Sequence, residues 1–208
     1  MDELLFSIKR ILKGEPFLNT FSTDMETLTA ELSGKTVAIV GNARSLSEQS
    51  LGPKIDACDV ILRMHAAPLP SPESHGSRTS WLALGMPVAQ NVINSRAPKR
   101  LLWMAKKRKR LRARFAQRSG FYLHPTAEWD RMAATLTAPP TTGIMLIDLV
   151  SGSTASEIHL FGFDFFTSLS LSGRRTAAQV PHDFAAEKRF TEALIARDPR
   201  VVHHKQKH

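Results

Sequence analysis

Short apolar runs that stop abruptly at glycine or at polar residues recur along the chain. The clearest run is Thr36–Val40, which ends at Gly41. A five-residue run that is apolar or β-branched throughout is typical of a buried parallel strand. Similar runs predict strands at 60–62, 81–84, 100–104, 121–123 and 157–161. Segments with helical spacing or capping signals predict helices at 24–32, 126–136, 144–150 and from 183 onward. This alternation predicts one α/β domain, with a mostly parallel central sheet flanked by helices.

The two ends of the chain have different patterns. Residues 1–33 form an N-terminal helical segment that we expect to pack on the domain, and residues 199–208 resemble a frayed basic tail. Within 3–13, five apolar residues repeat with a helical period: Leu4, Leu5, Ile8, Ile11 and Leu12. We expect this apolar face to pack on the core. The alternative is a helix on a membrane surface, with three cations directed at anionic lipid: Lys9, Arg10 and Lys13.

The charge of the chain is its most unusual property. The 208 residues carry a formal net charge of +9, with a sequence pI of about 10.1, which predicts an anionic partner. The one cysteine, Cys58, excludes an intrachain disulfide and fits a reducing compartment, so we expect a cytoplasmic protein. No apolar run approaches the ~18 residues that a membrane-spanning helix needs.

Much of the positive charge lies in residues 106–118. Eight of these thirteen residues are basic and none is acidic, and all are compatible with a helix. The segment can contact an anionic membrane or a glycolipid at the inner membrane face, or it can be a solvated face. A nucleic-acid arm is the less favoured reading, because Phe115 is the segment's only aromatic residue for base stacking.

Two stretches could hold a phosphate group. After the strand at 36–40, the Gly41–Asn42 turn precedes Ser45 and Ser47, either of which could cap a helix. Asparagine tolerates left-handed backbone angles, and a helix start presents free N–H groups to an anion. The second stretch is 141–143, two threonines and a glycine before the apolar run 144–150. The alternatives are an ordinary turn and an ordinary helix cap.

His182 is the candidate proton acceptor. It comes directly before Asp183, which we expect to cap the last helix. Because the positive end of a helix disfavours a cation, we expect a neutral imidazole there, able to deprotonate a hydroxyl group. The alternative is an ordinary surface histidine.

In this order, these segments resemble the animal-type sialyltransferases and their bacterial relatives. The long motif of that family resembles residues 37–46 and continues through 55–68 to 76–79. The short motif resembles 140–143 and runs to 158–163, and the very short motif, His-x4-Glu, is met by His182 and Glu187.

The resemblance implies a single Rossmann-like domain of the glycosyltransferase A-like kind. It implies an inverting transfer of sialic acid, or of a related acidic keto-sugar, from a CMP-sugar donor to a glycan acceptor. His182 would be the general base and Glu187 a supporting residue. The residues that would bind the nucleotide are Gly41, Asn42, Ala43, Arg63, His65, Thr141, Thr142, Gly143 and Gly162. We expect no metal and no cofactor besides the donor, since no Asp-x-Asp occurs in the chain.

The chain departs from the family pattern at several points. The paired cysteines of secretory members fall at about Val37 and Ala155, and the second asparagine of the long motif is His65. The third motif has no clear counterpart in 165–180, where Arg174 or Arg175 could contact the phosphate. Three rivals therefore stay open: a catalytically inactive nucleotide-binding module, a basic RNA-binding α/β protein, and a different nucleotide-dependent transferase.

Overall fold

A seven-stranded, fully parallel sheet forms the centre of the protein. The computed structural model describes residues 1–165 and 181–205. The strands are β1 (Thr36–Val40), β2 (Val60–Met64), β3 (Trp81–Leu84), β4 (Arg100–Trp103), β5 (Phe121–Leu123), β6 (Glu157–Phe161) and β7 (Val201–His204). Six of them were predicted from the apolar runs, and the predicted α/β class is confirmed.

The direction in which the chain adds strands to the sheet reverses once, beside β1. The order is β5-β4-β3-β2-β1-β6-β7, so the chain steps outward from β1 to β5 and then returns to the other side of β1. Val40 is paired with Arg63 of β2 and with Phe161 of β6. The carboxyl ends of β1, β2 and β6 therefore lie side by side, and in open α/β sheets ligands bind at such a switch point.

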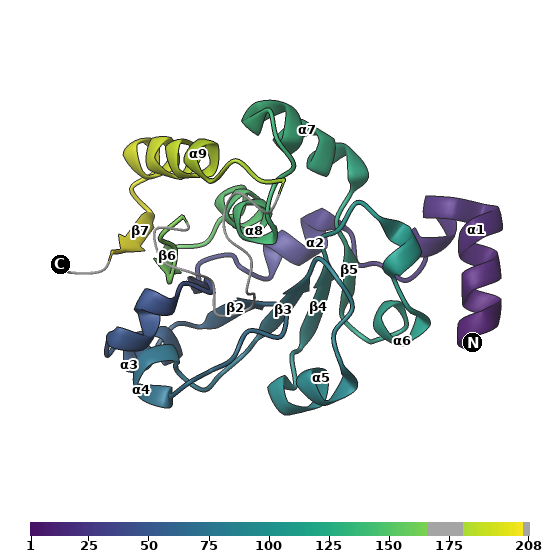
Figure 1. The fold of residues 1–208 in the computed structure, drawn as a ribbon, viewed down its shortest axis with the longest axis horizontal. Coiled ribbons are helices and arrows are strands. Elements are labelled where there is room, and N and C mark those ends of the chain that lie inside the picture. Colours follow the sequence, from purple (N-terminus) through teal and green to yellow (C-terminus); the bar gives the residue numbers. More distant parts are fainter. Residues whose placement is uncertain (166–180, 206–208) are drawn as a thin grey trace.

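Helices cover both faces of the sheet (Figure 1). One face carries α2 (Met25–Ala30), α7 (Thr126–Leu136), α8 (Thr142–Ser151) and α9 (Phe184–Arg197). The other carries α3 (Gly52–Asp56), α4 (Pro72–His75), α5 (Gln90–Arg96) and α6 (Ala113–Ala116). Successive β1 residues alternate between the two layers, with Val37 and Ile39 in one core and Ala38 and Val40 in the other. Alternation of this kind follows from the two-residue period of a strand.

Three of the helices begin at residues whose side chains cap them. Asp24, Thr141 and Asp183 accept hydrogen bonds from backbone N–H groups of α2, α8 and α9, at 2.7, 3.2 and 2.8 Å. Each side-chain oxygen satisfies an N–H group that has no partner within its helix. The caps fix where α8 and α9 start, and these two starts recur in the candidate site.

The first helix, α1 (Glu3–Asn19), forms as predicted, but the expectation for its apolar face is wrong. Leu4, Ile11 and Leu12 are 73%, 76% and 78% exposed, whereas Phe6 and Leu18 are buried. The ring of Phe6 packs against other aromatic rings at the start of the chain, so the opposite side of the helix faces the protein. Gly14, with φ +59°, interrupts the helix. None of the described helices has the length and apolar character to cross a bilayer.

The basic segment 106–118 does not form one continuous helix, although its sequence is compatible with one. It contains a 3-10 turn, η2 (Arg108–Arg110), and the single turn of α6, joined through the fully buried Leu111. Some of its basic side chains form ion pairs with acidic residues elsewhere in the chain. Lys106 pairs with Asp130, and Arg108 pairs with Glu15 of α1 at 2.6 Å.

The expected frayed tail is also wrong for residues 201–204. These residues form β7, which pairs in parallel with β6 from Ile158↔Val201 to Phe161↔His204. The ring of His204 stacks on Phe161 with centroids 4.3 Å apart. Pairing with a distant strand determines this element, and the local sequence carries little sign of it.

Candidate functional site

The turns after β1 and β6 are packed directly against each other. The N–H of Gly41 donates to Phe161 O at 2.7 Å, and the N–H of Ala43 donates to Gly162 O at 3.2 Å. A Cβ atom on Gly41 would lie 2.2 Å from Gly162 O, and Gly162 itself has φ +64°. Glycine is therefore required at both positions, where it sets the shape of the switch point.

The turn after Gly41 leads into a 3-10 helix, η1 (Arg44–Glu48), where the sequence predicted a capped α-helix. No side chain within the described residues caps it, and Asn42 does not have a positive φ. The Ala43 N–H is bound to Gly162 O, so this junction is not the expected row of free N–H groups. Asn42 instead lines a small cavity together with residues from the end of β2.

His65 follows β2 and has a left-handed backbone, with φ +54°. Its Nδ1 lies 3.4 Å from the N–H of Gly85, just beyond β3. A Cβ atom on Gly85 would meet both the His65 ring and the hydroxyl group of Thr142, at 3.0 and 2.8 Å. His65 and Thr142, distant in sequence, therefore meet at this glycine. Burial lowers the pKa of His65 to about 4, so its imidazole is neutral at pH 7.

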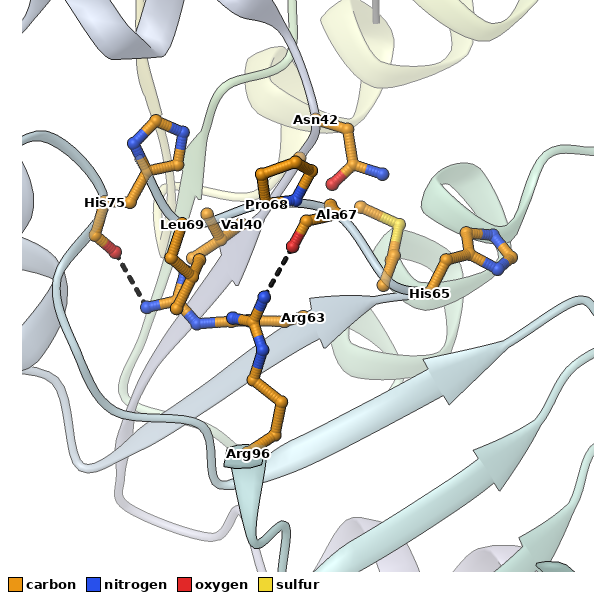
Figure 2. A pocket seen from close by; sticks show the side chains of 11 residues that line it. Val40, Asn42, Arg63, His65, Ala67, Pro68, Leu69, His75 and Arg96 are labelled. Atoms are coloured by element: carbon orange, nitrogen blue, oxygen red, sulfur yellow. Dashed lines mark hydrogen bonds between the residues drawn. The ribbon is translucent and has the colours of Figure 1, made fainter. Parts of the chain in front are cut away.

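Two arginines, the buried Arg63 and the half-buried Arg96, lie beneath this part of the site (Figure 2). Arg63 donates to the carbonyl oxygens of Arg78 and His75 at 2.8 and 2.7 Å, and Arg96 donates to Ala67 O at 2.5 Å. The Nη1 atoms of Arg63 and Arg96 are both buried without a partner in the described part of the chain. Both side chains line the cavity that Asn42 and His65 also line. Burial and the neighbouring Arg96 lower the pKa of Arg63 to about 10, which leaves it charged at pH 7.

The start of α8 is held by the start of α9. Thr141 donates its backbone N–H to one oxygen of Glu187 and its hydroxyl to the other, both at 2.8 Å. Glu187 is buried, and burial raises the pKa of its carboxyl to about 7. Both donors of Thr141 are thus engaged by Glu187. The N–H groups of Thr142 and Gly143, in the first turn of α8, then carry the partial positive charge of that helix terminus.

His182 is attached to the same stretch by a second contact. Its Nδ1 lies 2.8 Å from the carbonyl oxygen of Pro139. Because a carbonyl oxygen only accepts hydrogen bonds, Nδ1 carries the proton, and Nε2 is the basic nitrogen. The side chain is half-buried. Two contacts, Pro139 with His182 and Thr141 with Glu187, therefore fix this imidazole beside the start of α8.

Phe163 connects the β1 turn to α8. Cβ atoms built on Gly41 and Gly143 would both touch its ring, at 3.2 and 3.0 Å. A Cβ atom on Gly143 would also lie 3.6 Å from Met64 Sδ, at the end of β2. The predicted residues on β1, β2 and α8 thus form one contiguous site at the carboxyl edge of the sheet.

Two of the residues predicted to contact the phosphate cannot be placed relative to this site. Arg174 and Arg175 lie outside the described residues. In residues 1–165 and 181–205, no group of three or more histidine, cysteine, aspartate or glutamate side chains could hold a metal ion. A second cavity, of about 590 Å³, is lined by residues of α2, α7, α8 and α9, including Ser151 and Gly152 at the far end of α8 from Thr142.

Sequence reasoning missed Gly85, Arg96 and Phe163. Gly85 follows the strand at 81–84, where a ligand-side turn is expected in such a sheet, so its position carried a usable signal. Arg96 ends a short helix and carried none. Phe163 belongs to the stretch that resembles the short motif, but its sequence does not show that its ring touches two glycines.

Comparison with known proteins gives a family and a fold. Residues 7–119, more than half of the chain, match the profile of glycosyltransferase family 29 (sialyltransferase). No curated protein matches the chain significantly.

Solved structures of sialyltransferases resemble the fold. A mammalian sialyltransferase in complex with Gal-beta-1-3GalNAc-ortho-nitrophenol has a TM-score of 0.64 at 21% identity, covering 91% of this chain and 77% of its own. The sialyltransferase CstII from Campylobacter jejuni, in complex with cytidine-5'-monophosphate, has a TM-score of 0.58 at 13% identity, covering 82% and 80%. The profile match over more than half of the chain shows that this protein is a glycosyltransferase and belongs to family 29, the sialyltransferases.

Proposed function

We propose that the protein transfers sialic acid, or a related acidic keto-sugar, from a CMP-sugar to a hydroxyl group of a glycan. Similar sialyltransferase structures hold CMP, a substrate analogue or an acceptor sugar, which supports this donor and this class of acceptor. The observation that carries the proposal is the double contact between 139–141 and 182–187. It holds a basic imidazole nitrogen next to a helix start that suits a phosphate.

In the proposed reaction, Nε2 of His182 takes the proton of the acceptor hydroxyl group as its oxygen attacks the anomeric carbon. The bond from that carbon to the phosphate oxygen breaks, and CMP leaves with the electron pair. A single displacement inverts the anomeric carbon. Developing negative charge on the phosphate is stabilised by the N–H groups of Thr142 and Gly143, and no metal is assigned to this step. Asn42 and His65 lie at the carboxyl ends of β1 and β2, where they would contact the nucleotide.

The roles of the other predicted residues follow from their contacts. Gly41 and Gly162 set the switch-point turns, and Ala43 ties them together through its N–H. Thr141 and Glu187 position His182 and α8 through their mutual contact, and a nucleotide contact of Thr141 stays a prediction. Arg63 and Arg96 place two positive charges beneath the cavity beside Asn42, which favours an anionic ligand above them.

The test is transfer by purified protein from CMP-sialic acid to a panel of glycans, with and without a chelator. His182→Ala should keep stabilisation by CMP and lose transfer by at least about 100-fold, since it removes the general base. His159→Ala, on β6, is the matched control and should keep activity. Stabilisation by CMP without donor hydrolysis or transfer would instead identify an inactive nucleotide-binding module.

An RNA-binding function has less support. Phe115, the one aromatic residue of the basic segment, is fully buried and stacks on Trp103, so it cannot stack on a base.

A different nucleotide-dependent transferase is the third rival. Stabilisation by adenine or uridine nucleotides, with none by CMP, would favour it.

A cytoplasmic location, at the inner face of a membrane, stays a prediction from the single cysteine and the charge.

A further inference from the structure

An apolar stripe runs along the outward side of α1. Its members are Leu4, Leu5, Ile8, Ile11 and Leu12, with exposed fractions from 42% to 78%. They recur at three- and four-residue spacing and so share one side of the helix. Single exposed leucines need no explanation, but five on one helix face mark an interaction surface.

The opposite side of α1 holds the helix on the protein. Phe6 is buried, and Arg10 donates to Leu111 O at 2.5 Å. Glu3 accepts a hydrogen bond from the backbone N–H of Ala113 at 2.9 Å, and Glu15 pairs with Arg108. Residues 108–113 thus run antiparallel to α1 along its inner side. These contacts fix the helix with its apolar stripe directed away from the domain.

The charge around this helix is positive and largely unbalanced. All three acidic residues at its start and within it are engaged: Asp2 caps α1, Glu3 binds Ala113, and Glu15 binds Arg108. Five cations on α1 and on the adjoining segment have no side-chain partner among the described residues: Lys9, Lys13, Lys107, Lys109 and Arg110. An exposed apolar stripe on a helix that carries unbalanced positive charge, with more on the adjoining segment, is typical of a helix that lies in the interface of an anionic membrane.

From this arrangement we propose that α1 docks the protein on the surface of an anionic bilayer. The apolar stripe inserts at the level of the headgroups, and the five cations are attracted by the lipid charge. A second copy of the chain is a poorer occupant, because a symmetric contact through α1 would bring the same unpaired cations together. The basic segment 106–118 supplies charge to this surface, while the apolar contact comes from α1.

The position of α1 separates this surface from the candidate site. In Figure 1, α1 lies beside α6 at one end of the longest axis, while β7 lies near the other end. Changes to the stripe therefore leave Asn42, Thr142 and His182 untouched, and membrane binding can be tested apart from transfer.

The test is co-sedimentation with vesicles of phosphatidylcholine alone and of phosphatidylcholine mixed equally with phosphatidylglycerol. The protein should bind the anionic vesicles, with binding that weakens as salt increases. Ile11→Asp with Leu12→Asp should weaken binding on the order of 100-fold, because two side chains no longer leave water. Transfer to a water-soluble acceptor should be unchanged. The control Met25→Gln, at an exposed methionine of α2, should bind like the unmodified protein.

Three results would overturn the proposal. The first is no binding of the unmodified protein to anionic vesicles, and the second is equal binding of the Ile11→Asp/Leu12→Asp protein. The third is a dimer in sedimentation velocity that this double substitution dissociates, with no vesicle binding, which would make the stripe an interface between copies. Lys107→Glu with Lys109→Glu should reduce both the binding and its salt dependence; no effect would exclude attraction by anionic lipid.

Discussion

The carboxylate of Glu187 accepts two hydrogen bonds from Thr141, one from the backbone N–H and one from the hydroxyl, both at 2.8 Å. The same hydroxyl oxygen accepts the N–H of Ile144 at 3.2 Å and so caps α8. The pair formed by the buried Glu187 and the half-buried Thr141 therefore joins the starts of α8 and α9, and these starts carry the proposed phosphate contacts and the proposed base.

Thr141→Val should destabilise the fold by about 1–3 kcal/mol. It removes the cap of α8 and leaves one oxygen of the buried Glu187 without its donor. Thr141→Ser keeps the hydroxyl group and should cost far less. Urea unfolding of both proteins measures the difference, and equal midpoints would contradict this role of the hydroxyl.

Glu187→Gln should change how stability depends on pH. The pKa of Glu187 is about 7 in the folded protein and 4.5 in the reference state, so between these values the folded state keeps a proton that the unfolded state releases. The contribution of this group to stability therefore falls as pH rises from about 4.5 to 7. The melting temperature of the unmodified protein should decline relative to that of Glu187→Gln across this range. Parallel melting curves would show that Glu187 does not titrate there.

Acidification as a whole should destabilise the protein. Burial lowers the pKa of four histidines to about 4: His65, His75, His124 and His204. Below about pH 6.5 the unfolded chain takes up protons at these sites that the folded state does not, so their contribution is lost as pH falls towards 4. Four imidazoles outweigh the opposite effect of Glu187. Calorimetric melting at pH 7 and pH 5 should show the lower temperature at pH 5, and a higher one would contradict this balance.

His65→Asn should bind CMP more tightly, by about 3- to 10-fold. Nδ1 of His65 already accepts from the Gly85 N–H, so the imidazole offers a ligand only its Nε2–H donor, whereas an amide offers both a donor and an acceptor. Asparagine also tolerates the φ of +54° at this position. Titration calorimetry with CMP measures the affinity. His65→Val is the contrasting variant: its branched side chain opposes this backbone, so it should lower both stability and affinity. Weaker binding by the asparagine variant would place the nucleotide away from His65.

Gly41→Ala should cost at least about 2 kcal/mol of stability, since its methyl group would meet Gly162 O at 2.2 Å. Gly152→Ala is the matched control, with its nearest neighbour at 3.5 Å and an ordinary φ of −74°. Thermal melting of both proteins distinguishes them. A stable Gly41→Ala protein would mean that the two turns can move apart.

The sequence was most informative where local chemistry determines structure. Thr36–Val40 is apolar throughout and stops at glycine, so the strand could be predicted, and Thr141 and Asp183 are caps that any chain context would favour. The family motifs then directed attention to the carboxyl edge of the sheet. That Glu187 binds Thr141 could not be predicted, because the contact joins segments that only the tertiary fold brings together.

Elements that depend on distant partners were predicted poorly. The helical period of Leu4 to Leu12 is the same whether the stripe faces the core or the solvent, and only the burial of Phe6 and the contacts of Glu3 and Arg10 decide which. Val201–His204 becomes a strand because β6 offers an open edge. The segment 106–118 has good helix formers throughout, but the burial of Leu111 and Phe115 and the pairing of Arg108 with Glu15 favour two short turns.

The contacts of Pro139 with His182 and of Thr141 with Glu187 also link two events energetically. A nucleotide that tightens the first turn of α8 must, by reciprocity, favour the arrangement in which α9 holds its imidazole in place, and a correctly placed α9 must strengthen nucleotide binding by the same factor. Amide protons early in α9 would then exchange more slowly with solvent when CMP is bound. In such a molecule, occupancy of the donor site would itself prepare the base for the acceptor.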